Sequence, residues 1–225
     1  MMAGVCWHAS VARGPDGPAG KTADLLPRTT MRCLAPLLAA AICCVSLPAL
    51  AQEAPFGLRW GATIEELKIR GVTGDVVLDD GSIRTVQARS VSGAPADTGS
   101  VRLIVHRQYG LQRIVWQSRD LSDDPSGNKA LTAYQKLKAS MTDLYGPTKS
   151  AEEELPSGLA AVPAGFFLCL AEDGCAAIVS VWRTADVDVR VRLVGTTTGT
   201  GWLEAIYLGP DWSDVTQDMK RRGAR

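Results

Sequence analysis

The sequence predicts an α+β domain in which an antiparallel sheet is covered on one face by two helices. Two helical patterns and eight strand patterns support this prediction, in the order helix, four strands, helix, four strands. Short turns rich in Gly and Asp separate several of the strand patterns. We therefore expect strands that follow each other along the chain to pair antiparallel.

The first 51 residues are expected to lie outside this domain. From Met31 the chain reads as a secretory signal peptide, with a short basic start, an apolar run over residues 34–47 and small residues for cleavage near Ala51. The apolar run is shorter than the roughly 20 residues that a membrane-spanning helix needs. Residues 1–30 fit neither a leader nor a domain, so we expect either a mis-assigned start, with translation beginning at Met31, or a disordered segment.

The predicted mature chain, residues 52–225, is almost neutral. Residues 1–51 hold four of the 24 basic and two of the 24 acidic residues, so their removal leaves a formal charge of −2. A near-neutral chain with scattered basic residues gives no reason to expect nucleic acid as a partner. We also expect no stable membrane insertion after the leader is cleaved.

The N-terminal half begins with a short helix and continues with four strands. Thr63 and Glu66 form a capping box, which predicts a helix over residues 64–70. Trp60, just before this helix, is expected to be buried. Residues 79–82 (DDGS) predict a tight turn, because Gly tolerates positive φ and Asp can accept hydrogen bonds from the backbone. The predicted strands cover residues 75–78, 83–91, 101–108 and 114–118.

The longest helix is predicted between Asp124 and Gly146. Either Asp124 or Asn128 can cap its start, and Gly146 followed by Pro147 ends it. Apolar side chains recur at spacings of three and four: Leu131, Tyr134, Leu137, Met141, Leu144 and Tyr145. Since this stripe contains no His or Cys, we expect it to pack on the core and to bind no cofactor.

The C-terminal half is expected to start with a loop over residues 149–165. Four strands are then predicted over residues 166–170, 176–182, 186–193 and 202–208, and the third of these has the strictest alternation in the chain. From residue 209 the chain is expected to leave the fold, so that residues 213–225 form a frayed basic tail.

Cys169 and Cys175 flank a predicted turn at residues 172–174. Two cysteines in one short loop of an exported chain are expected to form a disulfide. The alternative is a redox-active pair, but the Cys-X-X-Cys spacing and a helix start that would lower a thiol pKa are both missing. We therefore expect a structural bond.

No catalytic, metal-binding or cofactor-binding set emerges from the residue types. His106 is the one histidine of residues 52–225, so a nucleophile has a single candidate base and zinc has no His/Cys set. Glu152, Glu153 and Glu154 could serve a carboxylate-based hydrolase, although such groups are usually solvated. We expect a protein without enzymatic activity and without a cofactor.

The opening FGLRWGAT at residues 56–63 resembles the start of a family of small exported periplasmic proteins of Gram-negative bacteria, most of them uncharacterised. Residues 144–147 (LYGP) and the Cys169/Cys175 hairpin are similar to their second half. The resemblance covers most of residues 55–210 and implies export and this fold. Some proteins of this build are antitoxins or inhibitors that hold another protein in the periplasm.

Three functional hypotheses follow. We first expect a periplasmic protein-binding or inhibitor module of the immunity type, whose partner is another protein in the periplasm. Its candidate contact surface is the polar side of the strand at residues 186–193, although such a side is ordinarily a plain solvent face: Asp186, Asp188, Arg190 and Arg192. The alternatives are a structural or envelope-accessory protein and a carboxylate-based hydrolase.

Overall fold

The computed structural model describes residues 52–154, 165–173 and 175–223. The predicted signal peptide, its cleavage site near Ala51 and residues 1–30 lie outside the described residues. All described residues belong to one unit of the chain, Leu47–Arg225.

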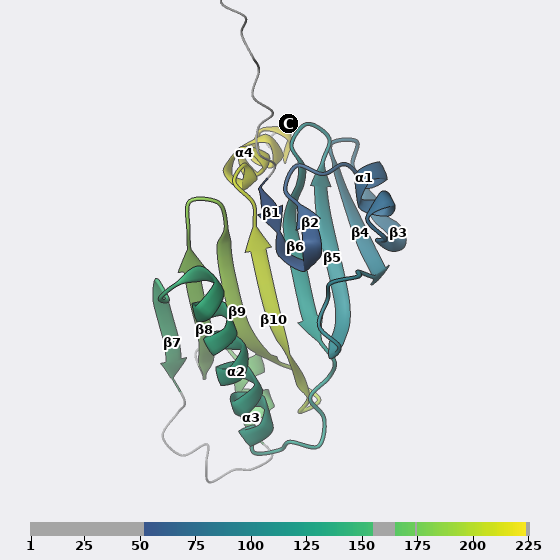
Figure 1. Cartoon of the computed structure of the whole chain (residues 1–225). Helices are drawn as coiled ribbons and strands as arrows, with labels where there is room; N and C mark the ends of the chain where they lie inside the picture. The colour runs from purple at the N-terminus through teal and green to yellow at the C-terminus, as the bar shows by residue number, and fades with distance from the viewer. Residues whose placement is uncertain (1–51, 155–164, 174, 224–225) are drawn as a thin grey trace, which may run out of the picture. The chain divides into compact units, whose positions relative to one another are not determined.

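Eight of the described strands form one antiparallel sheet, in the order β3-β4-β5-β6-β10-β9-β8-β7 (Figure 1). The sheet and the four helices confirm the α+β class. The N-terminal strands are β3 (Thr73–Asp79), β4 (Ile83–Ser90), β5 (Thr98–His106) and β6 (Gly110–Ser118). The C-terminal strands are β7 (Ser150–Glu154), β8 (Ala177–Arg183), β9 (Asp188–Gly195) and β10 (Gly201–Leu208). The two groups of four strands meet where β6 pairs with β10.

A small hairpin precedes the first helix. Strand β1 (Glu53–Ala54) pairs with β2 (Leu58–Arg59) around the 3-10 turn η1 (Pro55–Gly57). Helix α1 (Ile64–Ile69) begins with the predicted capping box: the hydroxyl of Thr63 accepts a hydrogen bond from the Glu66 N–H (3.2 Å), and the Glu66 carboxylate accepts one from the Thr63 N–H (2.8 Å). Trp60 is buried, as predicted.

Helix α2 (Asn128–Tyr145) packs on β8, β9 and β10 (Figure 1). Its N-cap is Gly127, so neither Asp124 nor Asn128 occupies the predicted cap position. The buried carboxylate of Asp124 nevertheless accepts the N–H of Ala130 in the first turn at 2.8 Å. Tyr134 and Met141 of the predicted stripe are buried, whereas Leu144 in the last turn is 71% exposed. The helix ends at Gly146, whose φ is +82°.

Two predictions for the C-terminal half are wrong. Part of the predicted loop forms the edge strand β7, because its backbone pairs with β8 from Ser150 to Glu154. The predicted strand at residues 166–170 is instead helix α3 (Phe166–Ala171), which buries Phe166 and Phe167. The sequence FFLCL is apolar at every position, so it shows neither a helical nor a strand period and does not distinguish the two. The order of elements after α2 is therefore β7, α3, β8, β9, β10 and α4.

The predicted frayed tail also forms a helix. The chain continues after Gly209 into α4 (Trp212–Gly223), in which Val215 is fully buried. Trp212, Val215 and Met219 are spaced by three and four residues, a helical period that the basic composition obscured.

The predicted disulfide between Cys169 and Cys175 is confirmed, with 5.2 Å between the two Cα atoms. It joins α3 to the residues before β8, however, and does not bridge a β-hairpin. Closing a ring of this sequence separation stabilises the fold by about 2 kcal/mol on the loop-entropy estimate.

Candidate functional site

The face of the sheet turned away from α2 carries a row of arginines and aliphatic side chains. Directly paired residues project from the same face of a sheet. Arg102 pairs with Val115, Val115 pairs with Ile206, and Ile206 pairs with Arg190. We call these four residues, together with the neighbouring Arg113, Arg192 and Glu204, the open face.

Two arginines of the open face are held by neighbours. The guanidinium of Arg192 lies 2.7 Å from the buried Glu204 carboxylate, which also accepts a hydrogen bond from Gln117 at 3.1 Å. The guanidinium of Arg113 lies over the ring of Trp212 at 5.5 Å, and burial lowers the pKa of Arg113. These contacts fix the two side chains against the sheet.

The other two arginines are free. Arg102 and Arg190 are exposed, and neither forms an ion pair with any residue in the described ranges. Between them lie Val115, which is buried, and Ile206, which is half-buried. The row therefore has an apolar centre, Val115 and Ile206, with one unpaired arginine at each end.

Three of the four residues that the sequence predicted as a contact surface lie on one side of β9, and Asp186 lies outside the strand. Arg190 and Arg192 lie on the open face, and Asp188 lies on the same side but is paired with Arg183 at 2.9 Å. Asp186 lies in the turn before β9 and accepts a hydrogen bond from Gln52. Sequence reasoning missed Arg102 and Arg113, although each alternates with apolar neighbours on its strand.

His106 joins α4 to the sheet. Its Nε2 lies 3.3 Å from the Asp218 carboxylate, and its Nδ1 accepts the backbone N–H groups of Gln108 and Tyr109 at 3.2 and 3.3 Å. Because Nδ1 accepts hydrogen bonds, the ring hydrogen is on Nε2, and this N–H donates a hydrogen bond to the Asp218 carboxylate. This hydrogen bond lowers the pKa of Asp218. Among the described residues, no hydroxyl or thiol is hydrogen-bonded to this ring.

The three adjacent glutamates do not converge on one site. Strand β7 alternates, so Glu153 lies on the side of α2 and Glu152 and Glu154 lie on the opposite side. Glu153 accepts hydrogen bonds from Lys138 and Tyr134, and the bond from Lys138 lowers its pKa.

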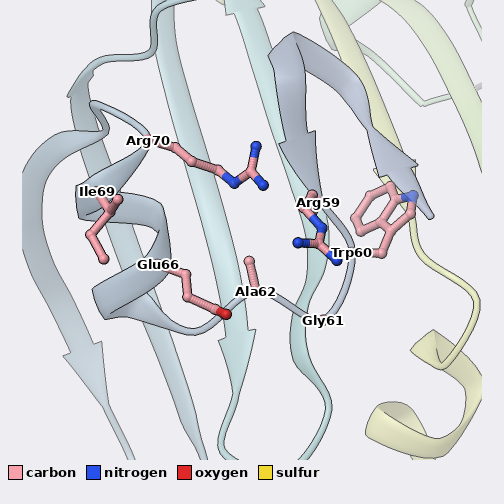
Figure 2. Close-up of a pocket in the computed structure, with 7 residues that line it drawn as sticks. All are labelled: Arg59, Trp60, Gly61, Ala62, Glu66, Ile69 and Arg70. Atoms are coloured by element: carbon pink, nitrogen blue, oxygen red, sulfur yellow. The ribbon is translucent and has the colours of Figure 1, made fainter. Parts of the chain in front are cut away.

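A cleft of about 390 Å³ lies between β2 and α1, where the opening motif folds (Figure 2). The Gly61 N–H donates to the Leu111 carbonyl at 3.0 Å, and the Leu111 N–H donates to the Ala62 carbonyl at 2.8 Å. A Cβ atom at Gly110 would lie 2.0 Å from the Gly61 carbonyl oxygen, so the two backbones touch. The motif thus docks the N-terminal hairpin on the start of β6.

Two arginines and one glutamate line the cleft, which gives it a net charge of +1. Figure 2 shows Arg59 from β2 and Arg70, which directly follows α1, extending into the space between these elements, with Glu66 beside them. The hydrogen bond from the Thr63 N–H lowers the Glu66 pKa, and both arginines contribute to the same shift. All three side chains are exposed, so water and salt screen their attraction for an ion. We therefore assign the cleft no ligand.

Neither a metal centre nor a membrane span stands out in the described part of the chain. It contains no group of three or more His, Cys, Asp or Glu side chains arranged to hold a metal ion. None of its helices combines the length and the apolar character that crossing a membrane requires. Comparisons of the chain with protein-family models, curated proteins and solved structures found no match.

Proposed function

We propose that this protein is a periplasmic protein-binding or inhibitor module of the immunity type, which holds another protein through the open face of its sheet. The observation that carries the proposal is the row from Arg102 through Val115 and Ile206 to Arg190. Arginine is enriched at protein interfaces and among the residues that dominate binding energy, and interface centres are apolar.

The support under the open face favours tight binding. Arg192 is held by Glu204, and Arg113 by Trp212, so little side-chain entropy remains to be lost when a partner binds. In this proposal α1 and α2 both cover the opposite side of the sheet, and α4 covers the open face at Arg113 through Trp212. The rest of the open face is left for the partner.

The charge of the open face indicates the chemistry of the partner. Four arginines stand against one buried carboxylate, that of Glu204, which Arg192 neutralises. A complementary surface would present carboxylates around an apolar centre. The disulfide and the predicted leader agree with a partner in the periplasm.

The test is recovery of a partner from periplasmic extract with the mature chain as bait. Arg102→Glu and Arg190→Glu reverse the two free charges, and Lys136→Glu makes the same change on the exposed side of α2 as a control. We expect wild type and K136E to recover a stoichiometric protein, and each open-face variant to bind it at least about tenfold more weakly.

Two results would contradict the proposal. One is repeated recovery of no protein by the wild-type bait; a deletion strain with an envelope defect would then favour the structural alternative. The other is equal recovery by R102E, R190E and K136E, since binding would then not use the open face.

A further inference from the structure

The two edges of the sheet differ in their side chains. All residues of β3 and β7 are exposed. Strand β3 presents three successive apolar residues, Val76, Val77 and Leu78, which are 48%, 60% and 55% exposed. Strand β7 presents Glu152, Glu153 and Glu154. Charged residues protect an edge strand from pairing, whereas an apolar edge is open to it.

The two acidic residues of β3 do not protect it, because its neighbour β4 neutralises both. Arg89 forms two short hydrogen bonds with Asp75, at 2.7 Å each, and Arg84 lies 2.8 Å from Asp79. On β7, by contrast, Glu152 and Glu154 form no ion pair with the residues that the structure describes. The outer edge of β3 is therefore nearly free of uncompensated charge.

The backbone of β3 also leaves one residue unpaired. The ladder with β4 shifts register between Val76 and Leu78, so Val77 has no partner in β4. Val77 is thus a bulge residue, and its apolar side chain remains 60% exposed at the edge of the sheet.

We propose that β3 pairs antiparallel with β3 of a second copy of this chain, about a two-fold axis at Val76. In this register Asp75 faces Val77 and Asp79 faces Thr73 of the other copy, so no carboxylate lies opposite another. A head-to-tail contact would instead pair β3 with β7, an edge that the uncompensated charges of Glu152 and Glu154 protect. The isologous contact is thus favoured, and it closes after two copies.

The dimer is independent of the proposed contact with a partner. Strand β3 is at the end of the sheet, whereas the open face is centred on β6, β10 and β9. A single added strand pair buries little surface, so we expect the weak dimer of a small interface, with the monomer dominant at low micromolar concentration.

Sedimentation velocity of the mature, disulfide-bonded chain tests the proposal. We expect the wild type to pass from monomer to dimer as its concentration rises, and Val77→Lys to weaken the dimer at least about tenfold. Leu144→Lys is the matched control, since it makes the same kind of change at an exposed apolar residue that lies on α2 and not on β3. L144K should dimerise like the wild type.

Cysteine cross-linking tests the register and does not depend on the lysine variant. Val76→Cys places two thiols across the axis, whereas Thr73→Cys places them far apart at opposite ends of the strand pair. We expect a cross-linked dimer from V76C and none from T73C under mild oxidation.

A wild type that stays monomeric at every concentration, or a V77K dimer as stable as that of L144K, would overturn the proposal. So would a monomer that binds a peptide strand of another protein at this edge.

Discussion

Replacing Gly110 by Ala should destabilise the protein far more than replacing Gly81 by Ala. Both glycines have positive φ, +63° and +85°, which costs an L-residue about 1 kcal/mol at either site. An added Cβ meets nothing within 4 Å at Gly81. At Gly110 it lies 2.0 Å from the Gly61 oxygen and 2.2 Å from the Gly61 carbonyl carbon. These are backbone atoms, so no side-chain rotation relieves the overlap.

The segment around Gly61 must therefore move away from β6. The two backbone hydrogen bonds that join Gly61 and Ala62 to Leu111 would break, at about 1 kcal/mol each. Together with the backbone strain and some lost packing around Trp60, we expect G110A to lower the free energy of unfolding by about 3 to 5 kcal/mol, against about 1 kcal/mol for G81A.

Urea denaturation followed by tryptophan fluorescence measures this difference, since Trp60 and Trp182 are buried and report on unfolding. Equal m-values would show that both variants unfold from the same compact state. If the two variants differed by less than about 0.5 kcal/mol, the contact between Gly61 and Gly110 would not hold the N-terminal hairpin in place, and the reasoning would be wrong.

Two further predictions concern the contacts under α2. Tyr134→Phe should lower the free energy of unfolding by about 2 kcal/mol. The Tyr134 hydroxyl lies 2.7 Å from the buried hydroxyl of Ser180, which loses its hydrogen-bond partner in this variant. The double variant with Ser180→Ala should cost about 1 kcal/mol less than the sum of the single variants, and strict additivity would contradict the pairing. The second prediction concerns acid: the Glu153 pKa is held below its ordinary 4.5, so the unfolded chain binds more protons as pH falls. The stability that Glu153 contributes is thus present above pH 4.5 and is lost below it as the folded pKa is reached. Glu153→Gln should flatten this loss in thermal melts, and Glu154→Gln, which breaks no ion pair in the described residues, should not.

Several elements follow from residues that are close together in the chain. The capping box of Thr63 and Glu66 starts α1 through two hydrogen bonds that span three residues. The turn at residues 79–82 forms because Asp79 and Asp80 accept backbone N–H groups two or three residues ahead. Such contacts need no distant partner, so the sequence alone predicts them.

Other elements depend on what packs against them. The segment SAEEE becomes strand β7 because the edge of β8 offers it a backbone partner, although glutamate is a poor strand former. Phe167 of α3 sits against Gly195 and Gly201, where any Cβ atom would collide with it. Neither partner is visible in the local pattern. The helix α4 is different, since the spacing of Trp212, Val215 and Met219 was a signal that could have been read.

The open face shows the same division. The sequence by itself determined that Arg190 and Arg192 alternate with buried valines on one strand, and hence that they share a side. Only the tertiary structure decided that Arg102 and Arg113 join them, because β6 pairs with β10, a strand far from it in the sequence. Alternation is set by the backbone geometry of each strand, whereas the choice of neighbouring strand depends on the packing of the whole sheet. A surface assembled from several strands therefore becomes visible only once the chain has folded.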